Sequence, residues 1–285
     1  MMSWDRSDSF DGHPTRGKTA RNRLRRIDLY LALTERELLR REDGDFHHAW
    51  YVDLGYGSLP FTTLESAERL RRVHPGLYVL GVEIDPERVK RAQAYGDERT
   101  VFRQGGFKLP LEKIKDTRET VRLIRAMNVL RQYDEVEVLE AYRQLGSSLL
   151  PGGLLVEGTS NPSGRIWAVN LLRRREDRSE LLLEGILFGT NFRDGFDPAM
   201  FQPVLPKAFI HHVTEGEPMD DFFRTWKEAW REAIGISVFG PRQWFVQTAR
   251  RLAERGFPID NRPKLLSRGM LLLRRNFGIG SIPLD

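Results

Sequence analysis

Residues 52–57, which read Val-Asp-Leu-Gly-Tyr-Gly, constrain the fold more than any other part of the chain. An apolar run ends there in Asp53, and two glycines follow one residue apart. A buried strand that breaks into a glycine turn brings the backbone close to a ligand. Thr62 and Glu65 then have the spacing of a capping box that opens a helix. Strand, glycine turn and helix begin a doubly wound α/β nucleotide-binding domain.

Three side chains near this turn distinguish between nucleotide ligands. The dinucleotide fingerprint has a third glycine three residues after the second, and Pro60 stands there. Asp53 is a poor neighbour for phosphate and a good one for the ammonium group of an amino acid. Glu83 ends the next apolar run, where a carboxylate can accept from two ribose hydroxyls. A ligand that joins an amino acid to adenosine without phosphate is S-adenosylmethionine.

Four segments follow one another with a recognisable spacing: residues 52–57, 81–85, 104–110 and 149–156. In order and spacing they resemble the class I S-adenosylmethionine-dependent methyltransferases, and together they span residues 46–160. The wider pattern, which includes residues 22–28 and 205–211, is similar to uncharacterised actinobacterial members of that family. The resemblance implies a Rossmann-like sheet and an enzyme that transfers a methyl group.

The resemblance also implies where the cofactor binds. Asp53, Gly55 and Gly57 would surround its methionine end, with Glu83 on the ribose hydroxyls and Ile84 against the adenine. Many members have an aspartate at the position of Gly106. Because glycine lacks that acceptor side chain, Phe107 is the expected adenine contact. The complete set of predicted cofactor residues is Asp53, Leu54, Gly55, Tyr56, Gly57, Glu83, Ile84, Gly106, Phe107 and Asn128.

Composition narrows the class of protein. A chain of 285 residues can hold one large α/β domain with insertions. No apolar run approaches the roughly 18 residues that span a bilayer, and no secretory signal is recognisable, so a cytoplasmic protein without a membrane partner is expected. The absence of cysteine excludes disulfides, cysteine-held clusters and the cysteine nucleophile of carbon-5 pyrimidine methylation. We expect no metal site.

The sequence divides into four expected regions. Residues 1–45 form a basic arm and helix, with residues 1 to about 17 predicted to be disordered. Residues 46–160 form the Rossmann-like core. Residues 161–240 are expected to be a substrate lid or insertion, and residues 241–285 a helix and strand that complete the core. The fold class is therefore α/β, a doubly wound methyltransferase-like sheet with N-terminal helices and an inserted lid.

Charge leaves two kinds of acceptor open. The net charge is only +5, but basic residues crowd into one stretch and into a second cluster at residues 173–175, which is predicted to be a solvated helix end. Such an arm can contact RNA phosphates or can be the solvated face of a helix. The small excess favours a small-molecule acceptor over RNA. The basic stretch consists of Arg16, Lys18, Arg21, Arg23, Arg25 and Arg26.

Candidate acceptor contacts lie after the expected strands, because ligands bind beyond the carboxyl ends of strands in open α/β sheets. Asn128 is followed by Val-Leu-Arg, whereas amino-group methyltransferases carry Pro-Pro-aromatic there, which disfavours that chemistry. His211 is a possible general base on an expected strand, and no catalytic residue is assigned. The predicted substrate contacts are Arg131, Asn161, Arg165 and His211.

Two alternatives accompany the methyltransferase interpretation. Leu59 stands where the family often has a third glycine, and Gly106 lacks an acceptor side chain. Both departures suit a non-catalytic protein that keeps the fold and binds S-adenosylmethionine. A nicotinamide-dependent oxidoreductase is disfavoured by Pro60 and Asp53. The stripe of Phe222, Trp226 and Trp230 has the spacing of a buried helix face and could otherwise stack a flat ligand.

Overall fold

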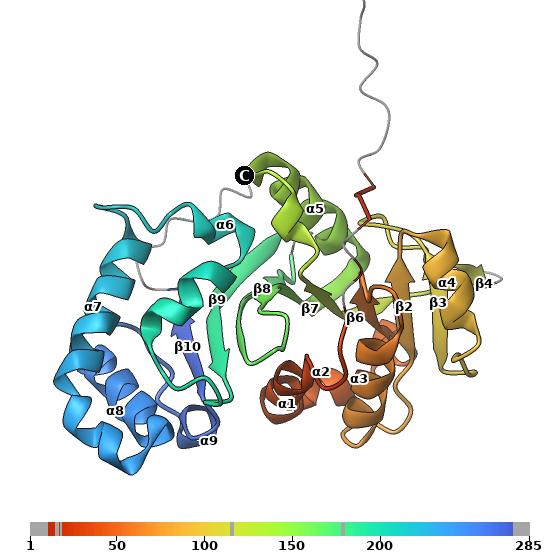
Figure 1. The fold of residues 1–285 in the computed structure, drawn as a ribbon. Helices are drawn as coiled ribbons and strands as arrows, with labels where there is room; N and C mark the ends of the chain where they lie inside the picture. Colours follow the sequence, from red (N-terminus) through yellow and green to blue (C-terminus); the bar gives the residue numbers. More distant parts are fainter. Residues whose placement is uncertain (1–10, 15–16, 18, 115–116, 178–179, 276–285) are drawn as a thin grey trace, which may run out of the picture.

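A computed structural model describes residues 11–14, 17, 19–114, 117–177 and 180–275. Its centre is one sheet of eight strands in the order β10-β9-β8-β7-β6-β1-β2-β3 (Figure 1). A separate short hairpin joins β4 to β5. The strands are β1 (Trp50–Leu54), β2 (Val79–Glu83), β3 (Thr100–Gln104), β4 (Lys113–Ile114), β5 (Thr117–Arg118), β6 (Val121–Met127), β7 (Leu149–Ser160), β8 (Ile166–Arg174), β9 (Leu181–Thr190) and β10 (Met270–Arg274).

The strand directions confirm the predicted fold class. Strands β3, β2, β1, β6 and β7 are parallel neighbours, whereas β8, β9 and β10 continue the sheet in antiparallel fashion. The chain builds outward from β1 to β3 and then returns to place β6 on the other side of β1. This reversal is the switch point at which open α/β sheets form a ligand crevice.

Helices cover both faces of the sheet, with α1, α2 and α3 on one face and α5, α7 and α8 packed against the other (Figure 1). Successive residues of a strand point to opposite faces, so Val52 packs with the α5 layer and Tyr51 with the α1–α3 layer. The helices are α1 (Arg25–Thr34), α2 (Arg36–Arg40), α3 (Phe61–Arg71), α4 (Pro86–Gln93), α5 (Glu135–Ser148), α6 (Lys207–Ile210), α7 (Pro218–Glu232), α8 (Pro241–Glu254) and α9 (Pro263–Leu266), with 3-10 turns η1 (Gly44–Phe46), η2 (Leu130–Gln132), η3 (Pro198–Val204) and η4 (Ile234–Phe239).

Two predictions made from local sequence were wrong, because at both places contacts with distant residues decide the structure. The capping box at the start of α3 does not form: Pro60 is the N-cap, Thr62 donates to Asp53, and Glu65 accepts from the backbone of Asn22. Residues 173–175 are not a helix end. They continue from the end of β8, where Arg173 pairs with acidic side chains of α2's N-cap and of β9.

The region expected to be a lid is partly built into the sheet. Its residues 166–190 form β8 and β9, which extend the sheet from β7, and only the segment from η3 to η4 packs outside the strands. Phe222 and Trp226 are buried, which confirms the buried-face interpretation of α7. Trp230 is half-buried and donates from its indole to the carbonyl of Phe196. Among the described residues, every helix is too short or too polar to cross a bilayer.

Glu157 in β7 is a buried acid on the α5 face of the sheet. Its carboxylate accepts from the Tyr142 hydroxyl at 2.7 Å and from the Asn170 amide at 3.2 Å. Burial raises the pKa of Glu157 from 4.5 to about 7, although both hydrogen bonds lower it. The folded protein therefore holds this proton over a pH range in which the unfolded chain has released it.

This shift predicts a stability that falls as pH rises. Because the folded-state pKa exceeds the unfolded one, the free energy of unfolding should drop by about 3 kcal/mol between pH 4.5 and pH 7. Glu157→Gln removes the titration and keeps a hydrogen-bonding side chain. Urea unfolding of both proteins at several pH values should give a difference that grows toward pH 8. A constant difference across that range would contradict the assignment.

Candidate functional site

The glycine turn follows β1 as the sequence predicted. Gly55 and Gly57 have φ values of 71° and 87°, which side-chain-bearing residues rarely adopt. The Gly55 amide donates to the Val82 carbonyl at 2.8 Å, and the Gly57 amide donates to the Glu83 carboxylate at 2.9 Å. The turn is thus tied to the end of β2, the strand that carries the second predicted acid.

A cavity of about 20 Å³ lies at the carboxyl ends of β1, β2, β3 and β6. Six of the predicted cofactor residues line it, whereas Asp53, Tyr56, Gly57 and Asn128 do not. Within the part of the chain that the structure describes, no lysine or arginine is among its lining residues. These are Asp11, Gly12, His13, Leu54, Gly55, Glu83, Ile84, Gly105, Gly106, Phe107, Val129 and Tyr133.

Residues 11–13, near the N-terminus of the chain, cover one side of this cavity. The Phe107 amide donates to the Asp11 carbonyl at 3.4 Å, and the Lys108 amide donates to the Asp11 carboxylate at 3.4 Å. The His13 ring stacks on Tyr133, with ring centroids 5.7 Å apart, and the Gln132 amide donates to the His13 carbonyl. A polar terminus gave no sequence signal for this packing, so sequence reasoning missed residues 11–13 and Tyr133. Arg16 and Lys18 lie outside the described residues.

Gly106 is the position that admits this segment. A Cβ atom there would lie 1.6 Å from the Asp11 carbonyl oxygen, a distance that no side chain can occupy. The glycine that replaces the expected adenine acceptor therefore makes room for the chain's own backbone.

Glu83 is buried at the floor of the cavity. One carboxylate oxygen accepts from the Gly57 amide, and the other accepts from the Ile84 amide at 3.2 Å and from Arg88 at 3.4 Å. Three donors from the turn and from α4 fix the orientation of this carboxylate.

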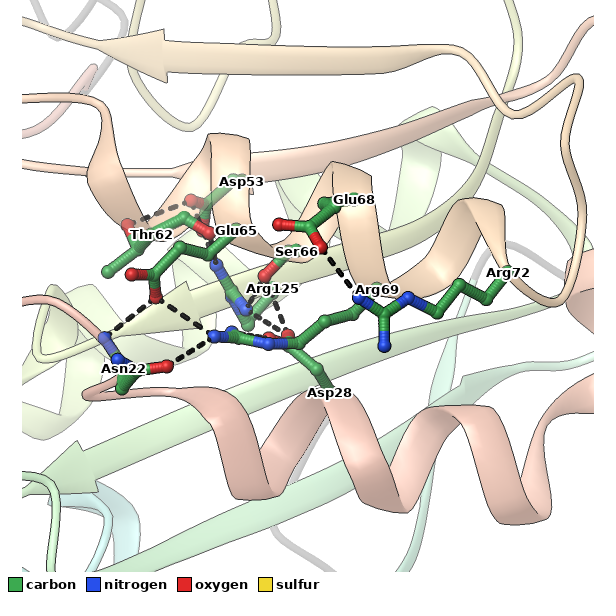
Figure 2. Close-up of polar contacts among 10 residues, drawn as sticks. All are labelled: Asn22, Asp28, Asp53, Thr62, Glu65, Ser66, Glu68, Arg69, Arg72 and Arg125. Carbon is green, nitrogen blue, oxygen red and sulfur yellow. Dashed lines mark hydrogen bonds and ion pairs between the residues drawn. The ribbon is translucent and has the colours of Figure 1, made fainter.

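Asp53 points away from the cavity, into the layer between the sheet and α3 (Figure 2). Its carboxylate accepts from the Thr62 and Thr63 hydroxyls at 3.1 and 2.7 Å. Arg125 of β6 binds it through two nitrogens, at 3.0 and 2.9 Å. The charge of Asp53 is therefore balanced by an internal arginine.

Arg125 also binds Asp28 of α1, at 2.6 Å, so one buried guanidinium joins two buried carboxylates. Ser66 and Arg69 of α3 add hydrogen bonds to Asp28 (Figure 2). Burial lowers the pKa of Arg125, but the charges of Asp53 and Asp28 raise it overall. Burial raises the pKa of Asp28 despite the nearby arginines. The network fastens α1, α3, β1 and β6 to one another.

Three of the predicted substrate contacts line neither the small cavity nor a second, larger cavity at the same edge of the sheet. Arg131 is exposed on η2. Asn161 accepts from the Arg165 amide and closes the turn between β7 and β8. His211 follows the short helix α6, and its ring lies 2.9 Å from the Lys207 ammonium, so its placement on a strand was wrong.

Asn128 and Arg165 have defined places near the same edge. Asn128 has a φ of 61°, and its side chain bonds the backbone amide and the hydroxyl of Ser160 at the end of β7. Arg165 pairs with Asp194 at 2.5 Å and lines a second cavity of about 990 Å³. Within the described residues, no group of three histidine or acidic side chains could hold a metal ion.

The buried network predicts a large difference between two arginines that Figure 2 shows together. Arg125→Leu leaves two buried carboxylates without their shared partner and should lower the free energy of unfolding by about 3–5 kcal/mol. Arg72→Leu is the matched control. Arg72 pairs with Glu68 at 2.6 Å, but both side chains are at least 70% exposed, so the loss should stay below about 1 kcal/mol. Urea unfolding measures both, and equal losses would contradict the role of Arg125.

The close contact at Gly106 makes a second prediction. Gly106→Ala should displace residues 11–13, because its methyl group would overlap the Asp11 carbonyl. Hydrogen exchange at the Phe107 amide should then become faster, since that amide loses its acceptor. Gly235→Ala is the control, since a Cβ there would have no neighbour within 4 Å. Unchanged exchange in Gly106→Ala would show that the segment does not hold this amide.

Comparison with known proteins gives only distant matches. No protein-family model and no curated protein matches the chain. Among solved structures, a putative methyltransferase in complex with the Trm112 activator of Haloferax volcanii is 22% identical, with a TM-score of 0.32, over 48% of this chain and 55% of that one. A putative sarcosine dimethylglycine methyltransferase from Galdieria sulphuraria is 17% identical, with a TM-score of 0.37, over 87% and 82%.

A third match is the magnesium protoporphyrin IX methyltransferase of Synechocystis with bound SAH, 15% identical, with a TM-score of 0.34, over 48% of this chain and 54% of that one. The chain spans about half the length of the first of these structures. With TM-scores below 0.5, these matches do not assign an activity, and the predicted likeness to actinobacterial proteins finds no support among them. Part of the chain is therefore similar to known methyltransferase structures. The assignment of the α/β fold rests on the strand order of the sheet and not on these matches.

Proposed function

We propose that this chain is an S-adenosylmethionine-dependent methyltransferase whose cofactor binds at the small cavity beside the glycine turn. One observation supports this most strongly. Six residues predicted from three separate segments, Leu54, Gly55, Glu83, Ile84, Gly106 and Phe107, line a single cavity at the switch point of the sheet.

The charges around the cavity favour adenosine over a dinucleotide. Among the described residues, no lysine or arginine lines it, so they offer no cationic side chain to a diphosphate there. The Glu83 carboxylate lines the cavity, where ribose hydroxyls can donate to it, and it is held by the Gly57 and Ile84 amides and by Arg88. The Phe107 amide and ring provide a donor and an apolar surface for adenine.

The segment of residues 11–13 must move for the cofactor to enter. The cavity of about 20 Å³ holds little more than one water molecule. The Asp11 carbonyl accepts the Phe107 hydrogen bond that we assign to adenine. We infer that residues 11–13 and the adenine compete for the Phe107 amide. The apparent affinity for the cofactor is then the intrinsic affinity multiplied by the fraction of molecules in which the segment has left the cavity.

Methyl transfer requires little covalent help from the protein. When bound, the sulfonium group supplies an electrophilic methyl carbon, and the protein aligns the acceptor with it and excludes water. In our proposal Glu83 orients the ribose, and Asp53 acts through Arg125 to hold the glycine turn in place. The acceptor in this proposal is a small molecule rather than RNA, and its identity is open.

One observation favours a second function. The closed cavity, together with Leu59 and Gly106, also suits a protein that keeps the fold and binds the cofactor without methyl transfer. Incubation with methyl-labelled cofactor and cell extract separates the two. Label in the small-molecule fraction supports the enzyme, and label in RNA would correct the acceptor. Cofactor binding without any transfer would support the second function.

Calorimetric titration with S-adenosylmethionine and S-adenosylhomocysteine tests the cofactor site. We expect a Kd below about 1 mM for the full chain and tighter binding for a chain that lacks residues 1–14. Glu83→Gln should weaken binding by about tenfold or more, since it removes a charged acceptor. His211→Ala, on an exposed residue outside the cavity, should leave it unchanged. Absence of binding by both the full and the shortened chain would overturn the proposal.

A further inference from the structure

The small cavity and the cavity of about 990 Å³ beside Arg165 differ in the charge of the side chains that line them. The larger one is formed by the start of α1, the turn after β7, the turn after β9, the start of α8 and the turn after α9. Strand β9 runs parallel to β7, because each is antiparallel to β8. Both cavities therefore open at the same edge of the sheet.

Guanidinium groups dominate the lining of this larger cavity. Its other polar lining residues are neutral asparagines and serines, including Asn191 and Ser163, and no aspartate or glutamate of the described part of the chain lines it. Five distant segments of the chain contribute the basic side chains, which are Arg21, Arg25, Arg26, Arg165, Arg193, Arg242 and Arg268.

These positive charges are poorly compensated within the protein. Arg165 pairs with Asp194, but Arg25, Arg193 and Arg242 have no carboxylate partner among the described residues. Burial lowers the pKa of the Arg26 guanidinium, and the charges of Arg242 and Arg25 lower it further. These arginines are therefore close enough to repel one another, and an anion between them would relieve the repulsion.

Two of these arginines are held in place by the protein. Arg26 donates to the Arg268 carbonyl, and Arg268 donates to the Lys264 carbonyl at 2.8 Å. The start of α1 is fixed in turn by the ion pair between Asp28 of the same helix and Arg125 of β6. Part of the cluster is thus ordered before any ligand arrives, which reduces the entropy lost on binding.

We propose that this cavity binds a small anionic ligand that carries more than one phosphate group. Guanidinium groups present paired N–H donors that match phosphate oxygens. A volume of about 990 Å³ is at the upper end of the range for small-molecule sites. Arginines from five separate segments line one cavity, which favours a compact ligand over an RNA strand. The site is separate from the cofactor cavity and does not depend on it.

Titration of the full chain with inorganic tripolyphosphate, without cofactor, tests this site. Tripolyphosphate should bind at least about tenfold more tightly than orthophosphate, because it can contact several guanidinium groups at once. Its affinity should fall as salt is added. The variant Arg25→Gln/Arg242→Gln should weaken binding by about tenfold or more, since two arginines without acidic partners are lost.

A matched control separates the cavity from overall charge. Arg143→Gln/Arg224→Gln removes the same charge from two exposed arginines of α5 and α7 that line no part of the cavity. Its affinity for tripolyphosphate should stay within about twofold of the original. Circular dichroism spectra and melting temperatures should be measured for both variants to check that they fold. If a variant fails to fold, Arg25→Lys/Arg242→Lys keeps the charge but loses the paired donors, and it should weaken binding less.

Three results would overturn the proposal. One is no binding of tripolyphosphate by the full chain at low salt. Another is an equal loss in the control variant, which would indicate general attraction between opposite charges. The third is tight binding of a single-stranded RNA oligonucleotide together with weak binding of tripolyphosphate, which would assign the arginines to RNA. Each result is independent of whether S-adenosylmethionine binds elsewhere.

Discussion

The ion triad of Asp28, Arg125 and Asp53 is the interaction on which the rest of the site depends. It lies between the sheet and two helices, where an unpaired charge would be strongly unfavourable. Asp53 is the second-last residue of β1, the strand that leads into the glycine turn, and Asp28 belongs to the helix whose start borders the arginine-lined cavity. One buried guanidinium therefore fixes the near walls of both cavities relative to the sheet.

The strands of the parallel core were predictable because their signals are local. The apolar run before the glycine turn forms β1, and Gly55 and Gly57 form the turn that follows it. The next apolar run, which Glu83 ends, forms β2. Strand β8 was missed because its last two residues, Arg173 and Arg174, are followed by Arg175, and three consecutive arginines resemble a solvated helix end. Only the folded chain brings Glu35 and Glu184 to Arg173 and makes that position favourable in a strand.

The sequence predicted the backbone around the small cavity better than the charges beside it. The glycine turn and Glu83 lie together as expected, but alternation along β1 puts Asp53 on the same face as Tyr51, away from the cavity. A sequence signal for this existed. Arg125 is a charged residue inside an apolar strand, and such a residue requires an acidic partner when buried. The identity of that partner, 72 residues away, could not be read from local pattern.

The two cavities at the edge of the sheet have opposite electrostatic character, and this limits what each can bind. A sulfonium cofactor carries positive charge, which seven arginines would repel, whereas the small cavity is lined by Asp11 and Glu83 and, among the described residues, by no lysine or arginine. A ligand with several phosphates would meet the reverse conditions. The charge of the lining alone can therefore select the ligand of each cavity, without a conformational change. The close contact of residues 11–13 with Gly106 adds a separate steric control to the small cavity alone, since none of these residues lines the larger one.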